Sequence, residues 1–576
     1  MAKGSDGLVS SQSAAGYSGP RQWRGRKVFG SVFLSVLLVT VLASCEALKK
    51  TADDFDELAA GLRGQATKAD LQFLGAVVAD EPNAALAGKE VLIAGGNAID
   101  AATATYFTLA VTLPSTAGLG GGGVCVVHDA PSNKTLALDF FSGSSKVTGM
   151  AKRRPNGVPG NVRGFYALHT QYGRLPWAQL IGPAEGLARF GTKVSRAFAS
   201  DISKIGGPLL DDPEAQRVFG RRGGNGLLGE GDTLIQTGLA DSLGRIREHG
   251  IDDMYKGAGA KRLADKVTAA GGSLTPEELV EFRPVWRNTL ELPLGDITVH
   301  FAPPPAGAGA VAAEMWAMLQ DGRRYRDAPD DEKPHLLAEV AMRAYASRAG
   351  WLLADGSVAG DAGQLASRER VKSLMKSYRA DRHTAAETLN PAPQELQDDP
   401  SAATFVTVDS NGSAVACALS MNGLFGNGII AGDSGILLAS VPGSGGRGSV
   451  SLGPILAVDH FTDDFFFAGA AAGGAAAPTA MVNVALQNLF EVGSLEKAVA
   501  AKRLHHGGLP DVVFYEQGYD EHAVDGLIKR GHRVAATAAI GRVNAIGCTQ
   551  GLPFEPASCE AISDTRGFGL GVKVSE

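Results

Sequence analysis

The chain has 576 residues, 44% of them apolar and 20% charged, which is typical of a globular protein with a large core. Its net charge of −7 argues against a nucleic-acid partner. Cysteines and histidines show no metal-ligand spacing, and the adjacent His505 and His506 would point in different directions on a helix or strand. We therefore predict no metal and no cofactor.

Residues 1–45 carry the pattern of an export signal. Four basic side chains precede the apolar run "VFGSVFLSVLLVTVLASC", which is short for a membrane span and ends at Cys45. The last four residues of this run resemble a bacterial lipobox, in which the cysteine is lipidated. We predict a signal peptide over 1–45, a polar tether over 46–71 and a body on the periplasmic side of the cell envelope, anchored to the membrane through a lipid on Cys45. A plain signal anchor is the alternative.

The rest of the chain alternates between helical and strand-like patterns. A helical pattern runs from Gly75 and is interrupted at Gly95-Gly96. The later segments, in chain order, are strand-like runs at 124–128 and 135–141, a mostly helical stretch over 160–380, short strands after Pro400, and helices over 478–503. This order predicts an α/β protein with sheets and helical layers, without a repeat of fixed period.

The stretch "SAATFVTVDSNGSAV" at 401–415 predicts a β-hairpin, because small and apolar residues alternate up to a turn of the Asn-Gly kind. Cys548 and Cys559 lie close in sequence and could close a small loop, since an exported chain can form disulfides. Cys125 and Cys417 sit in apolar strand-like runs, and we interpret them as buried free thiols.

A series of motifs runs in order through residues 72–573. They are "GKEVLIAGGNAIDAATATYFTLAVTLPSTAGLGGGGV", "VPGNVRGFYALHTQYGRLPWAQLIGPAEGLA", "PPPAGAGA", "HLLAEVAMRAYASRAGWLLAD", "MNGLFGNGIIAGDSGILL", "RLHHGGLPD" and "AISDTRGFGLG". Together they resemble the γ-glutamyltransferase (glutathione hydrolase) family. The resemblance implies a four-layer αββα sandwich of the N-terminal-nucleophile hydrolase type, with a large-subunit-like region at 72–401 and a small-subunit-like region at 402–576. In that family a precursor cuts itself, and the freed threonine attacks γ-glutamyl amides such as glutathione.

The family's reacting groups are mostly missing from the matching positions. Alignment on Asp409 and Gly412 places Ala402 where the family has its nucleophilic threonine. The arginine that binds the substrate carboxylate falls at Phe141, and "ASVPGSGG" replaces the acidic pair after "GILL". The chain keeps other groups that the resemblance implies for catalysis or for binding the substrate and its oxyanion. They are Ser420 (a threonine in the family), Asn422, Ser451, Gly473 and Gly474.

These positions predict an exported lipoprotein that is uncleaved and catalytically impaired, with a small γ-glutamyl or amino-acid-like ligand. The alternative is an active, divergent γ-glutamyl transferase or hydrolase, or a related amidohydrolase, that uses Thr404 as its N-terminal nucleophile. A shift of two residues along a strand keeps the same face, so Thr404 would point the same way as Ala402. We prefer to interpret Thr404 as an ordinary strand residue.

Overall fold

Two β-sheets and two helical layers make up the part of the chain that the computed structural model describes, which is residues 72–145, 154–205, 207–223, 226–353, 358–390, 401–443, 448–491 and 493–576. The predicted signal peptide, the tether and Cys45 lie outside these residues. The structure divides the chain once, between Leu71 and Gln72, and residues 72–576 belong to one unit. No helix of the described ranges is both long and apolar enough to cross a bilayer.

The first sheet has seven strands in the order β20-β1-β11-β12-β2-β3-β8, and each pair of neighbours is antiparallel. Its members are β1 (Phe73–Ala79), β2 (Gly122–Asp129), β3 (Lys134–Asp139), β8 (Val285–Asn288), β11 (Ala402–Asp409), β12 (Ala414–Ser420) and β20 (Leu570–Ser575). The predicted hairpin is therefore the β11–β12 pair at the centre of this sheet.

The second sheet has six antiparallel strands in the order β19-β18-β14-β13-β10-β9. They are β9 (Leu290–Leu294), β10 (Ile297–Phe301), β13 (Ile455–Asp459), β14 (Asp464–Ala472), β18 (Arg542–Leu552) and β19 (Cys559–Ser563). Three smaller sheets are formed by β15 (Leu504–His505), β16 (Val513–Glu516) and β17 (Val534–Thr537), by β4 (Gly143–Ser144) and β5 (Gly157–Val158), and by β6 (Thr192–Lys193) and β7 (Thr233–Leu234).

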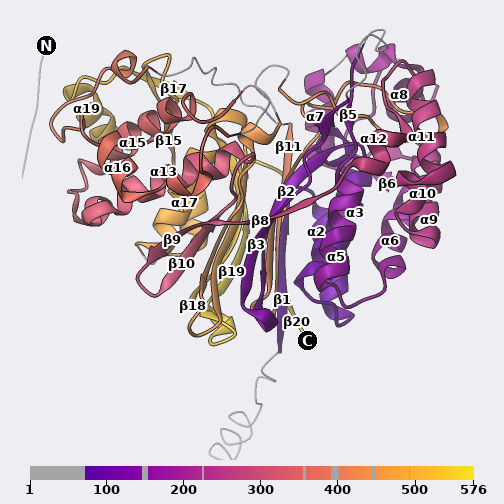
Figure 1. Cartoon of the computed structure of the whole chain (residues 1–576), viewed down its shortest axis with the longest axis horizontal. Helices are drawn as coiled ribbons and strands as arrows, with labels where there is room; N and C mark the ends of the chain where they lie inside the picture. Colours follow the sequence, from indigo (N-terminus) through magenta and orange to yellow (C-terminus); the bar gives the residue numbers. More distant parts are fainter. Residues whose placement is uncertain are drawn as a thin grey trace, which may run out of the picture. The chain divides into compact units, whose positions relative to one another are not determined.

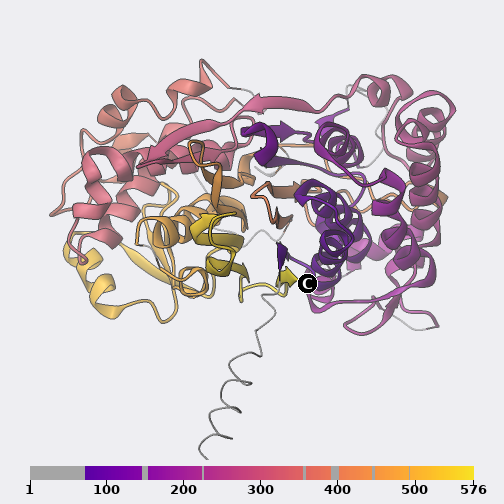
Figure 2. The same ribbon diagram turned by 90° about the horizontal axis from the view of Figure 1, so that it is seen from below.

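Helices cover the outer faces of both sheets (Figures 1 and 2). The first layer contains α2 (Pro82–Ile93), α3 (Ala98–Thr112), α4 (Pro114–Ala117), α5 (Asn161–Tyr172), α6 (Trp177–Phe190), α7 (Arg196–Ile205), α8 (Pro213–Phe219), α9 (Thr237–His249), α10 (Asp252–Tyr255), α11 (Gly257–Ala269) and α12 (Pro276–Glu281). The second layer contains α13 (Gly307–Gln320), α14 (Arg324–Asp327), α15 (Lys333–Arg348), α16 (Arg368–Leu374), α17 (Ala477–Leu489), α18 (Leu495–Ala500) and α19 (Glu521–Lys529). Short 3₁₀ turns include η6 (Gly432–Ser434), η7 (Ser449–Ser451) and η8 (Gly474–Ala476).

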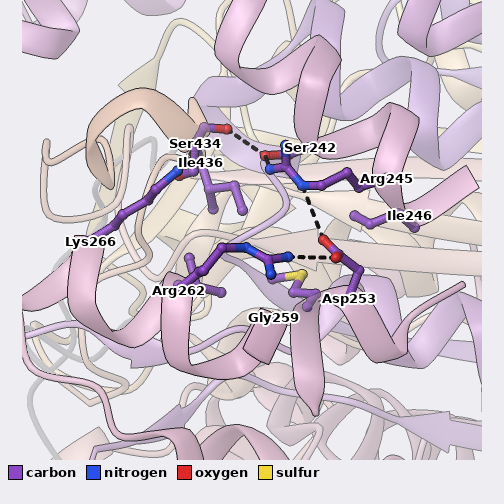
Figure 3. A pocket seen from close by; sticks show the side chains of 11 residues that line it. Ser242, Arg245, Ile246, Asp253, Gly259, Arg262, Lys266, Ser434 and Ile436 are labelled. Atoms are coloured by element: carbon purple, nitrogen blue, oxygen red, sulfur yellow. Dashed lines mark hydrogen bonds and ion pairs between the residues drawn. The ribbon is translucent and has the colours of Figure 1, made fainter. Parts of the chain in front are cut away.

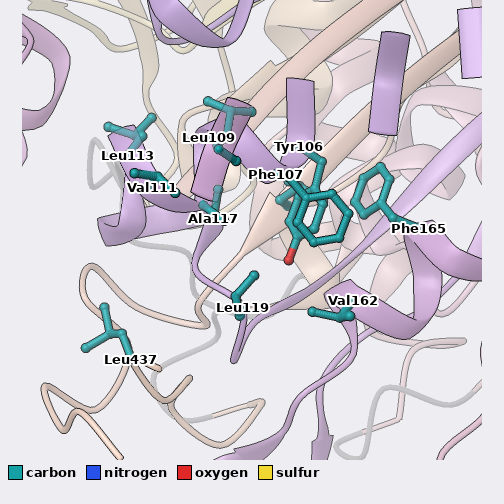
Figure 4. Close-up of a cluster of buried hydrophobic side chains, with 14 of the residues drawn as sticks. Tyr106, Phe107, Leu109, Val111, Leu113, Ala117, Leu119, Val162, Phe165 and Leu437 are labelled. Carbon is teal, nitrogen blue, oxygen red and sulfur yellow. The ribbon is translucent and has the colours of Figure 1, made fainter. Parts of the chain in front are cut away.

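The central strand β11 shows how the sequence builds these layers. Alternate residues of a strand point to opposite faces, so Ala403 and Phe405 pack on the first helical layer, while Ala402 and Val406 face the second sheet. In the first helical layer, the ring of Tyr106 on α3 stacks on the ring of Phe165 on α5, with centroids 4.0 Å apart (Figure 4). The chain thus has the four-layer αββα architecture that the resemblance implies.

Two parts of the secondary structure differ from the prediction. Residues 73–79 form the strand β1 where we expected a helix from Gly75, and the helix begins only at Pro82. The run "FLGAVVA" is almost fully buried, so it lacks the alternation that distinguishes a strand from a helix. The strands β8 to β10 also lie inside the stretch expected to be mostly helical.

Both cysteine pairs form disulfides. Cys548 is bonded to Cys559, its neighbour across β18 and β19. Cys125 is bonded to Cys417, which corrects our interpretation of these two as free thiols. They are 292 residues apart in sequence, and it is the register of β2 against β12 that places them directly opposite each other.

Candidate functional site

Ala402, the position that the resemblance assigns to the nucleophile, is the first residue of β11. It is buried and belongs to the apolar cluster that fills the space between the two sheets. Ser420 Oγ donates a hydrogen bond to the carbonyl oxygen of Ser401 (2.8 Å), and Arg542 Nη2 donates to the carbonyl oxygen of Ala402 (2.7 Å). The backbone on both sides of the Ser401–Ala402 peptide is therefore held by side chains, but residue 402 offers only a methyl group.

Thr404 lies two residues further along β11 and has no exposed surface. Its Oγ1 donates to Asp80 Oδ2 (3.2 Å) and accepts from Asn544 Nδ2 (2.9 Å). Its backbone N–H donates to the same Asp80 Oδ2 (2.8 Å), and its carbonyl oxygen accepts from the backbone N–H of Asp80 (3.1 Å). The hydroxyl is thus enclosed in a hydrogen-bond network, and the Ala403–Thr404 peptide lies inside a paired strand.

Three residues of this network were not among the predicted site residues. Asp80 follows β1, and its Oδ1 accepts from Asn544 Nδ2 (2.9 Å) and Arg542 Nε (3.3 Å). Arg542 and Asn544 both lie on β18, so the network joins the two sheets beside the start of β11. None of the three belongs to a motif. Arg542 and Asn544 are more than 460 positions away from Asp80, so the sequence carries no local signal for these contacts.

Ser420 and Asn422 form the second wall of the site. Ser420 is the last residue of β12 and is paired with Ala402 across the hairpin. Its Oγ accepts the backbone N–H of Asn422 (2.9 Å), while Asn422 Nδ2 donates to Ser142 Oγ (2.7 Å) and to the carbonyl of Ser440 (3.0 Å). The structure therefore places both predicted residues next to the Ser401–Ala402 peptide, with their polar groups satisfied internally.

The remaining predicted residues lie on loops that approach the same end of the sandwich. Gly473 and Gly474 follow β14 and have φ angles of +132° and +57°, which favour glycine. The strand before them ends opposite Arg542 in the sheet. Ser451 Oγ donates to the carbonyl of Gly448 (3.3 Å), and a Cβ on Gly448 would come within 2.9 Å of the Asn422 side-chain oxygen.

Phe141 is the residue that the resemblance places at the position of the substrate arginine. Its ring is half-buried and packs against the same between-sheet cluster that contains Ala402. No guanidinium or carboxylate stands at the carried-over positions among the described residues 141 and 439–443. The structure therefore shows apolar packing at this position.

A cavity adjoins the network on the side of the first helical layer. Its lining includes Asp80, Asp201, Arg542 and Arg566. Burial raises the pKa of Asp201 to about 6, although Ser115 Oγ donates to its carboxylate (2.6 Å) and so lowers the pKa in part. This cavity therefore holds a carboxyl group whose pKa is raised well above its usual value of 3.8.

A second cleft lies among α9, α10, α11 and η6 (Figure 3). Arg245 and Arg262 both contact the carboxylate of Asp253, at 3.1 and 2.5 Å, and Lys266 contacts Asp433 (2.7 Å). None of the residues carried over from the family lines this cleft. Its cations are already paired with carboxylates, so we do not assign the function to it.

Comparisons with known proteins identify the family of the chain. The model of the Gamma-glutamyltranspeptidase family matches residues 84–573. The chain belongs to the gamma-glutamyltranspeptidase family. It is 28% identical over 515 residues to the "Glutathione hydrolase proenzyme" of Escherichia coli (strain K12), covering 82% of this chain and 88% of that protein. It is also 28% identical over 535 residues to the "Acylase ACY 1 proenzyme" of Pseudomonas sp. (strain SE83), covering 84% and 92%.

The fold agrees with a solved structure as well. The cephalosporin acylase from Bacillus halodurans superposes with a TM-score of 0.72 at 22% identity, over 88% of this chain and 97% of that one. The family match and this superposition thus agree on the architecture of the chain.

Proposed function

We propose that this protein is an exported member of the gamma-glutamyltranspeptidase family that is neither self-cleaved nor catalytically active, and that it binds a small γ-glutamyl or amino-acid-like ligand at the cell envelope. The observation that carries the proposal is Ala402 at the first position of β11. An N-terminal-nucleophile reaction needs a hydroxyl or thiol at that position, both to cut the preceding peptide and to attack the substrate. A methyl group does neither.

The groups around Ala402 support a loss of catalysis in a fold that is otherwise preserved. Ser420 still donates to the Ser401 carbonyl, which is where a polarising donor would act during self-cleavage. The buried clusters on either side of the first sheet are intact, so the absence of a nucleophile has not been accompanied by a loss of the fold. A protein of this kind keeps a shaped site and can serve by binding.

The alternative nucleophile, Thr404, has little support from its surroundings. Its hydroxyl is fully buried and already has two partners, Asp80 and Asn544, so a substrate would have to displace both to reach it. Cleavage before Thr404 would also break a strand that is paired on both sides. These contacts favour a structural role for this threonine.

The side chain at position 141 affects how charged a ligand the site can bind. Without a guanidinium at that position, a free α-carboxylate would lose the bidentate partner that arginine supplies. The half-buried ring favours a ligand that is less charged than glutathione and presents an apolar part to the between-sheet cluster. The predicted lipid on Cys45 would hold this site at the membrane surface.

The proposal is tested by the state of the mature chain. Protein isolated from membranes should run as one band under denaturing conditions, and intact mass should show one polypeptide with a lipid on Cys45. A γ-glutamyl anilide should be hydrolysed no faster than in the matched variant Thr404→Val. Two fragments, of which the smaller begins at Ala402 or at Thr404, would overturn the proposal.

A further inference from the structure

Four histidines from distant parts of the chain meet in the second helical layer. His335 lies on α15, His383 follows α16, His506 follows β15, and His532 follows α19. One ring nitrogen of each of His383, His506 and His532 lies within 4.8 Å of the other two. No sequence motif predicts this cluster, because its consecutive members are 48, 123 and 26 residues apart and follow no metal-ligand spacing.

His532 has a ring nitrogen without a partner. Its Nε2 is 2.7 Å from His335 Nδ1, and His335 Nε2 is 2.8 Å from the carbonyl oxygen of Arg379. A carbonyl only accepts, so His335 Nε2 carries a hydrogen and, in the neutral ring, His335 Nδ1 accepts the hydrogen of His532 Nε2. This leaves His532 Nδ1 with a free lone pair, and that atom is buried with no hydrogen-bond partner.

His506 is oriented in the same manner. Its Nε2 donates to Asp511 Oδ1 (3.0 Å), and its Nδ1 accepts only the backbone N–H of Gly508 (3.1 Å). Asp511 is fixed in turn by the backbone N–H of Ala386, which donates to Oδ2 (3.0 Å). A carboxylate that holds one imidazole nitrogen and directs the other is the usual second shell of a metal-bound histidine.

His383 stands between two carboxylates. Its Nδ1 lies 2.7 Å from Glu339 Oε1 and its Nε2 lies 3.0 Å from Asp511 Oδ1. Both ring nitrogens therefore have a carboxylate partner. For this ring to bind an ion, Nε2 has to lose its proton and its contact with Asp511, while Nδ1 keeps its hydrogen on Glu339.

We propose that His383, His506 and His532 bind one divalent transition-metal ion of the Zn²⁺ type, with His335, Glu339 and Asp511 orienting the three rings. Three neutral imidazoles and an open fourth position suit Zn²⁺, Ni²⁺ or Co²⁺, whereas Mg²⁺ and Ca²⁺ prefer oxygen ligands. Binding releases the Nε2 proton of His383 to solvent, and the ion replaces the contact of that nitrogen with Asp511 and the contact of His506 Nδ1 with Gly508. No electron transfer is involved.

The burial of the histidines indicates the route by which the ion reaches the site. The side chains of His383 and Asp511 are 10% and 11% exposed, while those of His506 and His532 have no exposure, so the ion enters from the His383 side. The bound ion would tie α15, the segment after α16 and the chain after α19 together through their histidines and orienting groups. The site shares no residue with the network around Ala402, so it stands independently of the proposed function.

The test uses the tag-free full chain, stripped with a chelator and titrated with Co²⁺. We expect one ion per chain, a visible absorption band typical of a four-coordinate site, displacement by Zn²⁺, and a rise in Tm with Zn²⁺ because the ion binds the folded state. His383→Gln, at a partly exposed position, should abolish the band and the Tm rise, and Asp511→Asn should weaken binding about 10- to 100-fold.

His300→Gln is the matched control, because His300 is also buried and hydrogen-bonded to another histidine but lies on β10, outside this cluster. It should bind Co²⁺ as the natural chain does. Circular dichroism establishes that each variant is folded. A folded natural chain that shows no Co²⁺ band, or a folded His383→Gln variant that binds as tightly as the natural chain, would overturn the proposal.

Discussion

The hydroxyl of Thr404 connects the two sheets, since Oγ1 contacts Asp80 at the end of β1 and Asn544 on β18. Replacing it with the isosteric valine should lower the free energy of unfolding by about 1–2 kcal/mol, because two buried polar groups lose a partner while the volume is kept. Thr404→Ser, which retains the hydroxyl, should lose less of that stability. Urea denaturation followed by circular dichroism measures the difference.

The banding pattern on a denaturing gel should be identical for the natural chain and the Thr404→Val variant. A loss of fragments or of amidase activity in that variant would contradict the structural role of Thr404. Thr407→Val is a useful comparison, since Thr407 is equally buried on β11 and donates to the carbonyl of Ala98 (2.7 Å) but is not part of the network.

Asp201 is a buried carboxyl whose pKa, about 6, lies above the ordinary value of 3.8. The folded state therefore binds the proton more tightly than the unfolded state, and the stability contribution of Asp201 falls as the pH rises from 3.8 towards 6. Asp201→Asn should stabilise the protein at pH 7 by at most about 3 kcal/mol and change little at pH 4, since one pKa unit corresponds to about 1.4 kcal/mol. Thermal melts across this pH range check the prediction, and a variant less stable than the natural chain at pH 7 would refute it.

The two disulfides lie in similar antiparallel strand pairs but close loops of very different length. Cys125 and Cys417 are 292 residues apart, whereas Cys548 and Cys559 are 11 apart. In the loop-entropy model, removing the long-range bond by a double change to alanine should cost about 5–6 kcal/mol, against about 3 kcal/mol for the short one. Guanidinium denaturation of the two double variants, each against the natural chain, measures both losses. Equal losses would show that loop entropy does not dominate.

The elements that the sequence predicted well are those with a periodic signal or a turn motif. The β11–β12 hairpin was found from its alternation and from the turn before Gly412, which has a φ of +87°. The break between α2 and α3 was found from Gly95-Gly96, and α3 then begins at Ala98 behind a capping box made by Asn97. β1 was missed because it is buried and carries no alternation.

Across the molecule, the resemblance predicted candidate site positions, but it could not predict their contacts. The structure places Ser420 beside both Ala402 and Asn422, as expected from the ends of a hairpin. The link from Asp80 to Arg542 joins residues 462 positions apart, and the histidine cluster around His532 arises from packing between separate elements. A single sequence carries no signal for such pairs, since each member looks like an ordinary polar residue at the end of an element.

Whether the groups around residue 402 still support self-cleavage can be tested by placing a hydroxyl at that position. Ser420 Oγ already donates to the Ser401 carbonyl, so a hydroxyl at position 402 would face a peptide whose carbonyl is polarised. Ala402→Thr should therefore cut itself slowly between residues 401 and 402, giving two fragments on a denaturing gel and a new N-terminus at 402. Hydrolysis of glutathione should remain absent, because Phe141 still replaces the substrate arginine. Ala402→Val, which has the same shape without the hydroxyl, should stay in one piece.

A folded Ala402→Thr chain that also stayed intact would contradict this prediction. The groups around Ser420 would then be insufficient for self-cleavage, and more than the nucleophile would be missing from the site.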